Sequence, residues 1–214
     1  MQYSINDLKA EVRVALDLNI NSTPLSTLED LDTLTNDEII EAMLPRAARM
    51  VIEAAPHHLL DRGEPFAEVV KWNTAIGQGM GWIQLPDDFL RLVTFQMSDW
   101  AYPVVQPILE DDPLYIQQKS KYGIKGNTER PVVAIVHQPI GLVLEFYSCN
   151  SAENDIQVKR ARYIPIPRVV EGIISFPEKL KEAVVMQTCY LVSQTLADDG
   201  AAARYEKITQ NMLQ

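Results

Sequence analysis

The apolar residues of this chain change their spacing twice along its length, and this change limits the folds available to it. Near both ends they recur every three or four residues, which is the period of a helix with one buried face. Between about residues 69 and 164 they alternate with polar residues, or form short runs bounded by Gly and Pro, which is typical of strands. We therefore expect an α+β protein in which N- and C-terminal helices pack as a helical bundle around a central antiparallel β-rich insertion.

The same change of spacing divides the chain into three segments. We predict N-terminal helices over residues 1–62, a β-rich insertion over 63–168, and a C-terminal helix pair over 169–214 that completes the helical bundle. The chain has 214 residues, of which 47% are hydrophobic, so it is long and apolar enough to bury a core. A disordered chain is excluded.

Capping signals predict where the first two helices begin. Ser4 with Asp7 and Thr35 with Glu38 each place a hydroxyl and an acidic residue at the spacing of a capping box. Leucine, valine and alanine then repeat at helical spacing over residues 5–17. Both patterns predict helices that begin just after the hydroxyl residue.

Proline and polar residues predict where the helices are interrupted. Pro45 falls inside the second helix, where a proline removes one backbone hydrogen bond, so we expect a kink or two abutting helices. Residues 18–34 suit an extended connector. Near the C-terminus, Ser175 with Pro177 predicts the start of a helix and Gly200 its break before a last helix.

The middle of the chain predicts short antiparallel strands. Three glycines, Gly77, Gly79 and Gly81, lie between two strand-like runs and indicate a hairpin turn rather than a phosphate loop, because GxGxxG spacing is missing. The next strand, around residues 93–98, is predicted to have one wet face and one dry face. Three further strands are predicted to form an antiparallel meander, over residues 130–137, 141–149 and 156–164.

Charge is divided unevenly along the chain. The whole chain holds 19 basic and 29 acidic residues, a net charge of −10, which argues against a protein that wraps nucleic acid. Only residues 119–168 are basic, with 8 bases and 4 acids. This stretch is either an anion-binding or partner-docking surface, or simply a solvated loop and a charged strand face.

No catalytic, metal-binding or cofactor-binding pattern is present in the sequence. Cys149 and Cys189 have no CxxC or Cys/His spacing and no identifiable base, and a reducing compartment is the simplest inference. His57 and His58 are adjacent, so capping of a helix end suits them better than metal binding. We expect a soluble chain made inside the cell, without catalytic residues, metal or cofactor.

Aromatic residues concentrate between positions 72 and 115. All three tryptophans, Trp72, Trp82 and Trp100, lie in this stretch, which has few Lys or Arg residues to interleave with them. A stacking platform for nucleic acid would need such interleaving. Core packing or a protein interface is the better interpretation, since Trp is common at interface anchor points.

One segment carries a family resemblance. Residues 81–100 read GWIQLPDDFLRLVTFQMSDW and contain Leu85, Pro86, Asp87, Asp88, Phe89, Leu90 and Arg91. This segment resembles the "LP-x-D-hydrophobic-L-R-hydrophobic" segment of head-tail adaptor proteins from tailed bacteriophages. Phe176 and Pro177 before a long helix, then Gly200 and a second helix with Tyr205, are similar to that family's closing helix pair. The chain is also similar to the tail-tube adaptors of short-tailed phages and the ring proteins of crAss-like phages.

The resemblance implies a structural protein of the virion. It implies a homo-oligomeric ring, commonly of twelve copies, that docks below the portal protein and contacts a downstream neck or tail protein. Genomic DNA would pass through the lumen without sequence-specific binding, and an acidic lumen would repel its phosphates. The implied location is the head-tail interface of the virion, with synthesis in the host cytoplasm and no membrane partner.

Eight residues are candidates for contacts within such a ring or with its neighbours. They combine the tryptophans, the acidic turn, the following arginine and the basic strand: Trp82, Asp87, Asp88, Arg91, Trp100, Lys159, Arg160 and Arg162. Asp87 or Asp88 would cap the turn, and the fork of Arg91 suits a bidentate pair with a carboxylate.

Two other functions remain open at the level of the sequence. The first is another oligomeric protein of the virion, such as a neck, head-completion or tail gatekeeper protein with a different partner. The second is an enzyme whose site is assembled from carboxylates distant in the sequence. A ring of about a dozen copies would favour the adaptor, and a monomer with a ligand-filled cleft would favour the enzyme.

Overall fold

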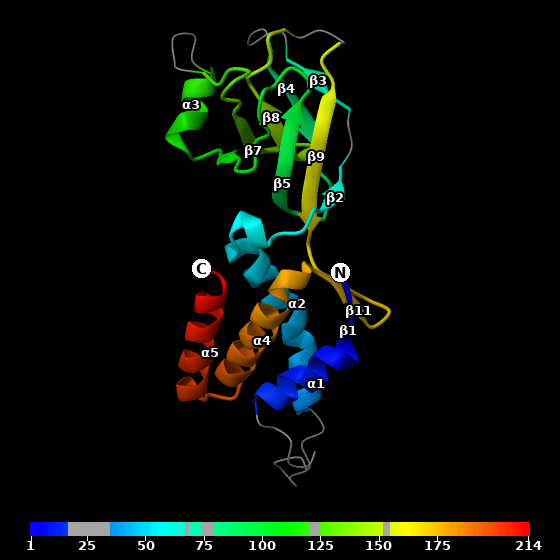
Figure 1. The fold of residues 1–214 in the computed structure, drawn as a ribbon, viewed down its shortest axis with the longest axis vertical. Coiled ribbons are helices and arrows are strands. Elements are labelled where there is room, and N and C mark those ends of the chain that lie inside the picture. Colours follow the sequence, from blue (N-terminus) through cyan, green and yellow to red (C-terminus); the bar gives the residue numbers. More distant parts are fainter. Residues whose placement is uncertain (17–34, 67–68, 74–78, 120–124, 152–154) are drawn as a thin grey trace. The chain divides into compact units, whose positions relative to one another are not determined.

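The computed structural model describes residues 1–16, 35–66, 69–73, 79–119, 125–151 and 155–214, so the predicted connector over 18–34 lies outside the described residues. It shows a mixed α and β protein whose strands pair mostly in antiparallel fashion (Figure 1). The chain divides into two compact units. Unit 1 contains Met1–Asp61 and Pro167–Gln214, and unit 2 contains Arg62–Ile166.

Unit 1 is mainly helical. Its helices and short 3-10 turns are α1 (Ile5–Ala15), α2 (Asn36–Ala54), η1 (His57–Leu59), η2 (Glu178–Leu180), α4 (Lys181–Thr195) and α5 (Asp199–Met212). Its three strands pair in the order β1 (Gln2–Ser4), β11 (Ile173–Ser175), β10 (Val169–Val170). Helix α4 contacts α1, α2 and α5. Because these helices surround it, α4 buries residues on most of its circumference and has little amphipathic character.

The helix starts in unit 1 follow the sequence in part. Thr35 forms the predicted capping box with Glu38: its hydroxyl accepts from the Glu38 amide, and its own amide donates to the Glu38 carboxylate at 2.7 Å. The capping box predicted at Ser4 is wrong, because Ser4 makes no side-chain cap and lies in β1, paired with Ile173. Helix α2 is a single helix that contains Pro45, not two abutting ones.

The turn between α4 and α5 differs from the prediction. Gly200 lies inside α5 instead of ending a helix, and Asp198 caps α5 by accepting from the Ala201 amide at 3.0 Å. Helix α4 ends at Thr195, and Ala197, two residues beyond it, has a left-handed φ of 57°. Ser175 lies in β11 and does not cap η2, the 3-10 turn that leads into α4. The Glu178 amide at the start of η2 donates instead to the Asp61 carboxylate at 3.3 Å.

The described residues of unit 2 form two sheets and one short helix, α3 (Pro113–Lys119). The smaller sheet has the order β2 (Glu64–Pro65), β9 (Val158–Pro165), β5 (Phe89–Met97). The larger has the order β3 (Lys71–Trp72), β4 (Gly81–Gln84), β8 (Gly141–Phe146), β7 (Val133–Gln138), β6 (Ile108–Leu109). All pairs in these two sheets are antiparallel except β6 with β7.

The predicted hairpins are present, but the predicted meander is wrong. Strands β3 and β4 pair, as do β7 and β8. Gly79 in the first turn has a φ of 76°, and a Cβ there would lie 1.7 Å from the Cys149 carbonyl oxygen. Strand β9 does not continue the meander from β8. It pairs instead with β5 and β2 in the other sheet, because β4 already occupies the second edge of β8.

The larger sheet of unit 2 is covered on both faces. One face and the smaller sheet together form a core that includes Phe95, Leu144, Phe146 and Tyr163. The other face packs against α3 through Tyr115, which joins residues of β7 and β8 in a second core. Unit 2 is therefore three layers: the smaller sheet, the larger sheet and the α3 layer.

Candidate functional site

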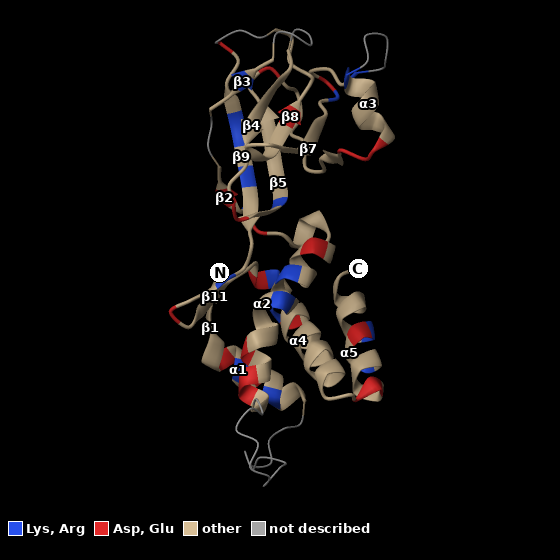
Figure 2. Cartoon of the chain, turned by 180° about the vertical axis from the view of Figure 1, so that it is seen from behind, with Lys and Arg blue, Asp and Glu red and all other residues tan. Residues whose placement is uncertain are grey.

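The smaller sheet of unit 2 has an outer face that carries basic side chains. Ala161 and Tyr163 of β9 point into the core, and successive side chains of a strand point to opposite faces. Arg160 and Arg162 therefore point away from the core, opposite Gln96 and Thr94 of β5. Lys159 adjoins them at a β-bulge. We call Lys159, Arg160 and Arg162 the basic face; Figure 2 shows basic residues along β9.

The basic face is exposed and only lightly engaged. Lys159 and Arg160 are exposed, and neither forms an ion pair with any residue in the described part of the chain. Arg162 is half-buried and donates to the Gly63 carbonyl at 3.1 Å, which fixes its position beside β2. The face thus offers two free cations and one oriented guanidinium, which suit carboxylates or phosphates.

The predicted wet face of β5 is only partly wet. Gln96 is buried and donates from Nε2 to the Trp100 carbonyl at 3.0 Å, so the chain after β5 covers this part of the sheet. Arg91, at the start of the same strand, is half-buried opposite Ile164. Burial lowers the pKa of Arg91. A guanidinium nevertheless remains charged there, because its ordinary pKa is far above neutrality.

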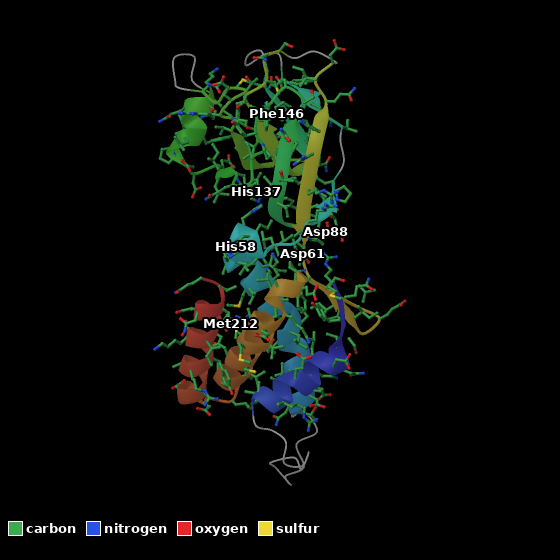
Figure 3. The ribbon with its side chains drawn as sticks, in the orientation of Figure 1. His58, Asp61, Asp88, His137, Phe146 and Met212 are labelled. Carbon is green, nitrogen blue, oxygen red and sulfur yellow. The ribbon has the colours of Figure 1, made fainter. Side chains whose placement is uncertain are left out.

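The acidic turn before β5 connects the two sheets of unit 2. The Phe89 amide donates to the Pro86 carbonyl at 3.0 Å, which closes the turn. Asp88, labelled in Figure 3, accepts from the Tyr163 hydroxyl at 2.9 Å, and its carbonyl accepts from the Ile166 amide at 2.7 Å. Asp88 is therefore a structural residue that ties β9 to the turn, whereas Asp87 is exposed and forms no ion pair with the described residues.

The three tryptophans occupy different environments. Trp100 is 3% exposed and packs edge-on against Phe95 and Phe146, with ring centroids 5.6 and 6.4 Å apart. It is a core residue, so we do not retain it as an interface candidate. Trp82 is half-buried in β4, where the Lys71 ammonium lies 4.5 Å from its ring centroid. Trp72 packs edge-on against Phe146.

A polar cluster that sequence reasoning missed surrounds Glu145 in β8. Its carboxylate accepts from the hydroxyls of Tyr147 and Tyr115, from Gln138 Nε2 at 3.1 Å, and lies 3.5 Å from the Lys119 ammonium. These residues come from α3, β7 and the end of β8, which are distant in the sequence, so no spacing could reveal them. A cavity of about 220 Å³ adjoins the cluster, lined also by Trp82 and Met80 among others.

The titratable groups of this cluster are all bonded to one another. Burial, then the hydrogen bond to Glu145, raises the pKa of Tyr147 far above its ordinary value, and burial also raises the pKa of Tyr115. Burial opposes protonation of Lys119, but its hydrogen bond to Tyr115 and the charge of Glu145 raise its pKa overall. Tyr115, Lys119 and Tyr147 therefore keep their protons at neutral pH, and each of them contacts the Glu145 carboxylate. The cluster anchors α3 on the sheet and presents no free nucleophile or base.

The cysteines and histidines likewise show no arrangement for catalysis or metal binding in the described residues. Cys149 and Cys189 are buried free thiols, and burial raises the pKa of each, to about 12 for Cys189. The His58 carbonyl accepts from the Lys179 ammonium at 3.0 Å, and η1 holds both adjacent histidines. Across the residues that the structure describes, no three His, Cys, Asp or Glu side chains are grouped to hold a metal ion.

Neither the comparison with protein-family models nor that with curated proteins finds a match to this chain. No helix in the described part of the chain combines the length and the apolar composition that crossing a bilayer requires. The interpretation of the basic face consequently depends on its own geometry and on the segment around Leu85–Arg91.

Proposed function

We propose that this chain is a structural head-tail adaptor of a phage virion, which forms a ring below the portal, joins capsid to tail and lets genomic DNA pass through its lumen. The observation that carries the proposal is the role of the Leu85–Arg91 segment, the part with the family resemblance. It is a folded junction between two sheets, and its Asp88 is used for structure. No catalytic role is needed to explain the residues of this segment.

The details of the junction support this structural role. Leu85 is buried, and its amide donates to the Leu142 carbonyl at 2.9 Å, so the end of β4 is held on β8. Pro86 then turns the chain into β5, which belongs to the other sheet. Phe89 stacks on Tyr163 with ring centroids 5.8 Å apart. A segment of this kind sets the relative position of two sheets, as an assembly module requires.

The finer architecture of the proposal is a helical bundle with a central β-rich insertion. It is supported by the contacts of α4 with α1, α2 and α5, which come from both ends of the chain. It is also supported by the continuous span of unit 2, Arg62–Ile166, between the two parts of unit 1. The bundle would be the ring body, and the insertion would carry additional contacts.

The charges of the two units fit a ring around DNA. Unit 1 holds 9 basic and 17 acidic residues, a net charge of −8, whereas unit 2 holds 10 and 12, a net charge of −2. A lumen lined by unit 1 would repel phosphates, so DNA would slide without binding. The proposed partners are the portal protein above the ring and a neck or tail protein below it.

The location of the chain in virions tests this proposal. Antibody-bound gold particles on virions of the phage that encodes the chain are expected only at the junction of capsid and tail. A control antibody against the major capsid protein should label the whole head. Labelling spread over the capsid, or absence of the chain from purified virions, would contradict the adaptor function.

A further inference from the structure

Unit 2 has a second unusual surface, on β6 and α3. Three apolar side chains are exposed there: Leu109 by 57%, Leu114 by 48% and Ile116 by 72%. Glu110 and Asp111 lie between them in the sequence and are exposed as well. Leu114 and Ile116 flank the buried Tyr115 on opposite sides of α3 and do not share a face. We call the consecutive residues Leu109, Glu110 and Asp111 the acidic-apolar surface. In the described residues, Glu110 and Asp111 form no ion pair, and β6 is an edge strand paired only with β7.

The basic face and the acidic-apolar surface lie on opposite outer sides of unit 2. The basic face is the outer side of the smaller sheet, whose inner side packs on the larger sheet. Helix α3 covers the opposite face of the larger sheet through Tyr115. Figures 1 and 2, which view the chain from opposite directions, both show α3 and β9 on opposite sides of unit 2.

We propose that these two surfaces bind each other between neighbouring copies of the chain, in a head-to-tail contact. Glu110 and Asp111 of one copy would face Lys159 and Arg160 of the next, while Leu109 is removed from water. This inference rests on the proposed function, because a head-to-tail contact that closes on itself makes a ring.

A second copy is the occupant that the observations favour. Each surface carries the charge that the other lacks, and two free acids match two free cations. Because the two surfaces lie on different sides of one body, one contact leaves the complementary surfaces of both end copies open for further addition. A nucleic acid could meet the basic face alone, but the acidic charges would repel it from the other surface. Burial of Leu109 gives the contact an apolar part that salt does not screen.

Charge reversal tests the proposed contact. One variant carries Lys159→Glu with Arg160→Glu, a second carries Glu110→Lys with Asp111→Lys, and a third carries all four changes. Sedimentation of the full chain over a range of concentrations measures self-association. We expect the wild type to self-associate, and each two-residue variant to lose at least about tenfold in association constant, since like charges then face each other.

Rescue gives the decisive result. The four-residue variant should associate like the wild type, because its charges are exchanged but still complementary. An equimolar mixture of the two two-residue variants should also associate, with the variants alternating. The proposal is overturned by a monomeric wild type at low salt, by two-residue variants that associate normally, or by a mixture and a four-residue variant that both stay monomeric.

Two controls separate this contact from general charge and folding effects. Arg46→Glu with Lys207→Glu makes the same change in net charge at exposed helical positions of unit 1, and should leave association unchanged. Single cysteines are placed at exposed positions, Leu109→Cys in one sample and Arg160→Cys in another, where no buried packing is changed. When the samples are mixed and oxidised, mixed disulfides should exceed those from random pairing; equal yields would also overturn the proposal.

The failure of this inference is distinguishable from failure of the adaptor function. If the chain labels the virion neck but charge reversal leaves association intact, the ring uses other surfaces. If charge reversal and rescue behave as expected but the chain is absent from virions, the contact is real and the adaptor function is wrong.

Discussion

At the scale of single residues, backbone strain and burial set the properties of the unusual side chains, and no reactive group stands out in the described residues. Most titratable side chains inside the units are paired, as Asp88 is with Tyr163 and Glu145 is with Lys119. Two other residues are unusual: Ala197, which like Glu171 is a non-glycine residue with positive φ, and Arg91, a half-buried cation. Each leads to a substitution whose effect has a definite sign.

Replacing Ala197 by glycine should stabilise the protein. Ala197 has a φ of 57°, a conformation that costs a residue with a Cβ about 1 kcal/mol and costs glycine little. We expect the Ala197→Gly variant to gain about 0.5 kcal/mol in its free energy of unfolding, measured with urea. The control Ala203→Gly, at an exposed site within α5, should lose about 1 kcal/mol. Equal effects at both sites would contradict the assignment.

Replacing Arg91 by lysine should weaken the fold. Burial disfavours a charged side chain, and a lysine ammonium is more strongly hydrated than a guanidinium and less able to bond through several donors. Thermal melts should show Arg91→Lys less stable by about 1 kcal/mol. The matched change Arg46→Lys, at an exposed position of α2, should have almost no effect. Identical melts for the two variants would count against a special role for Arg91.

The Tyr163 hydroxyl should make stability depend on alkaline pH. Burial, followed by its hydrogen bond to Asp88, raises the pKa of Tyr163 to about 12. A raised pKa in the folded state means that the contribution is complete below pH 10, where the unfolded tyrosine is also protonated, and is lost as pH rises from about 10 to 12.

The Tyr163→Phe variant isolates this effect. Unfolding free energies measured from pH 8 to 12 should fall less steeply for Tyr163→Phe than for the wild type above pH 10, by up to about 1 kcal/mol per pH unit. Below pH 9 the two curves should run parallel, with the variant lower because Asp88 has lost its partner. Parallel curves over the whole range would show that Tyr163 has an ordinary pKa.

At the scale of elements, local signals predicted which segments are helices or strands, and non-local pairing escaped prediction. The α1 helix and the β7–β8 hairpin follow from the spacing of their apolar residues. The partner of β9 did not follow, because pairing with β5 joins residues far apart in sequence. The Glu145 cluster was missed for the same reason, since it draws side chains from three separate elements.

Caps illustrate how tertiary contacts change a local signal. Asp61, far along the chain, replaces Ser175 as the acceptor for the turn before α4. Asp198, which follows the end of α4, caps the start of α5. A hydroxyl or carboxylate at the right spacing therefore predicts a nearby helix end but not which group will satisfy it.

The two predicted capping boxes should differ in energetic importance. Thr35→Ala removes a cap that is formed and should cost about 1 kcal/mol in the free energy of unfolding. Ser4→Ala removes a hydroxyl that makes no cap bond and should cost well under about 0.5 kcal/mol. Urea unfolding of the two variants measures the difference. A larger loss at Ser4 would contradict the cap assignment.

At the scale of the whole molecule, the division into units refines the meaning of the net charge. Most of the excess of acids belongs to unit 1, and unit 2 is nearly balanced. Within unit 2 the positive and negative charges lie in different places. The cations of β9 lie on the outer side of the smaller sheet, and Glu110 and Asp111 lie just before α3. A charge count by sequence segment indicated a basic stretch, but only the strand register shows which of its residues share a face.

The measurement that tests the central claim most directly is the mass of the complex that this chain forms with the portal protein of the same phage. Native mass spectrometry of the co-expressed proteins should give one portal ring bound to about twelve copies of the chain, as a closed head-to-tail ring requires. Substitution of Lys159 and Arg160 by glutamate should lower the number of bound copies. A portal ring that binds no copy of the chain would contradict the adaptor function.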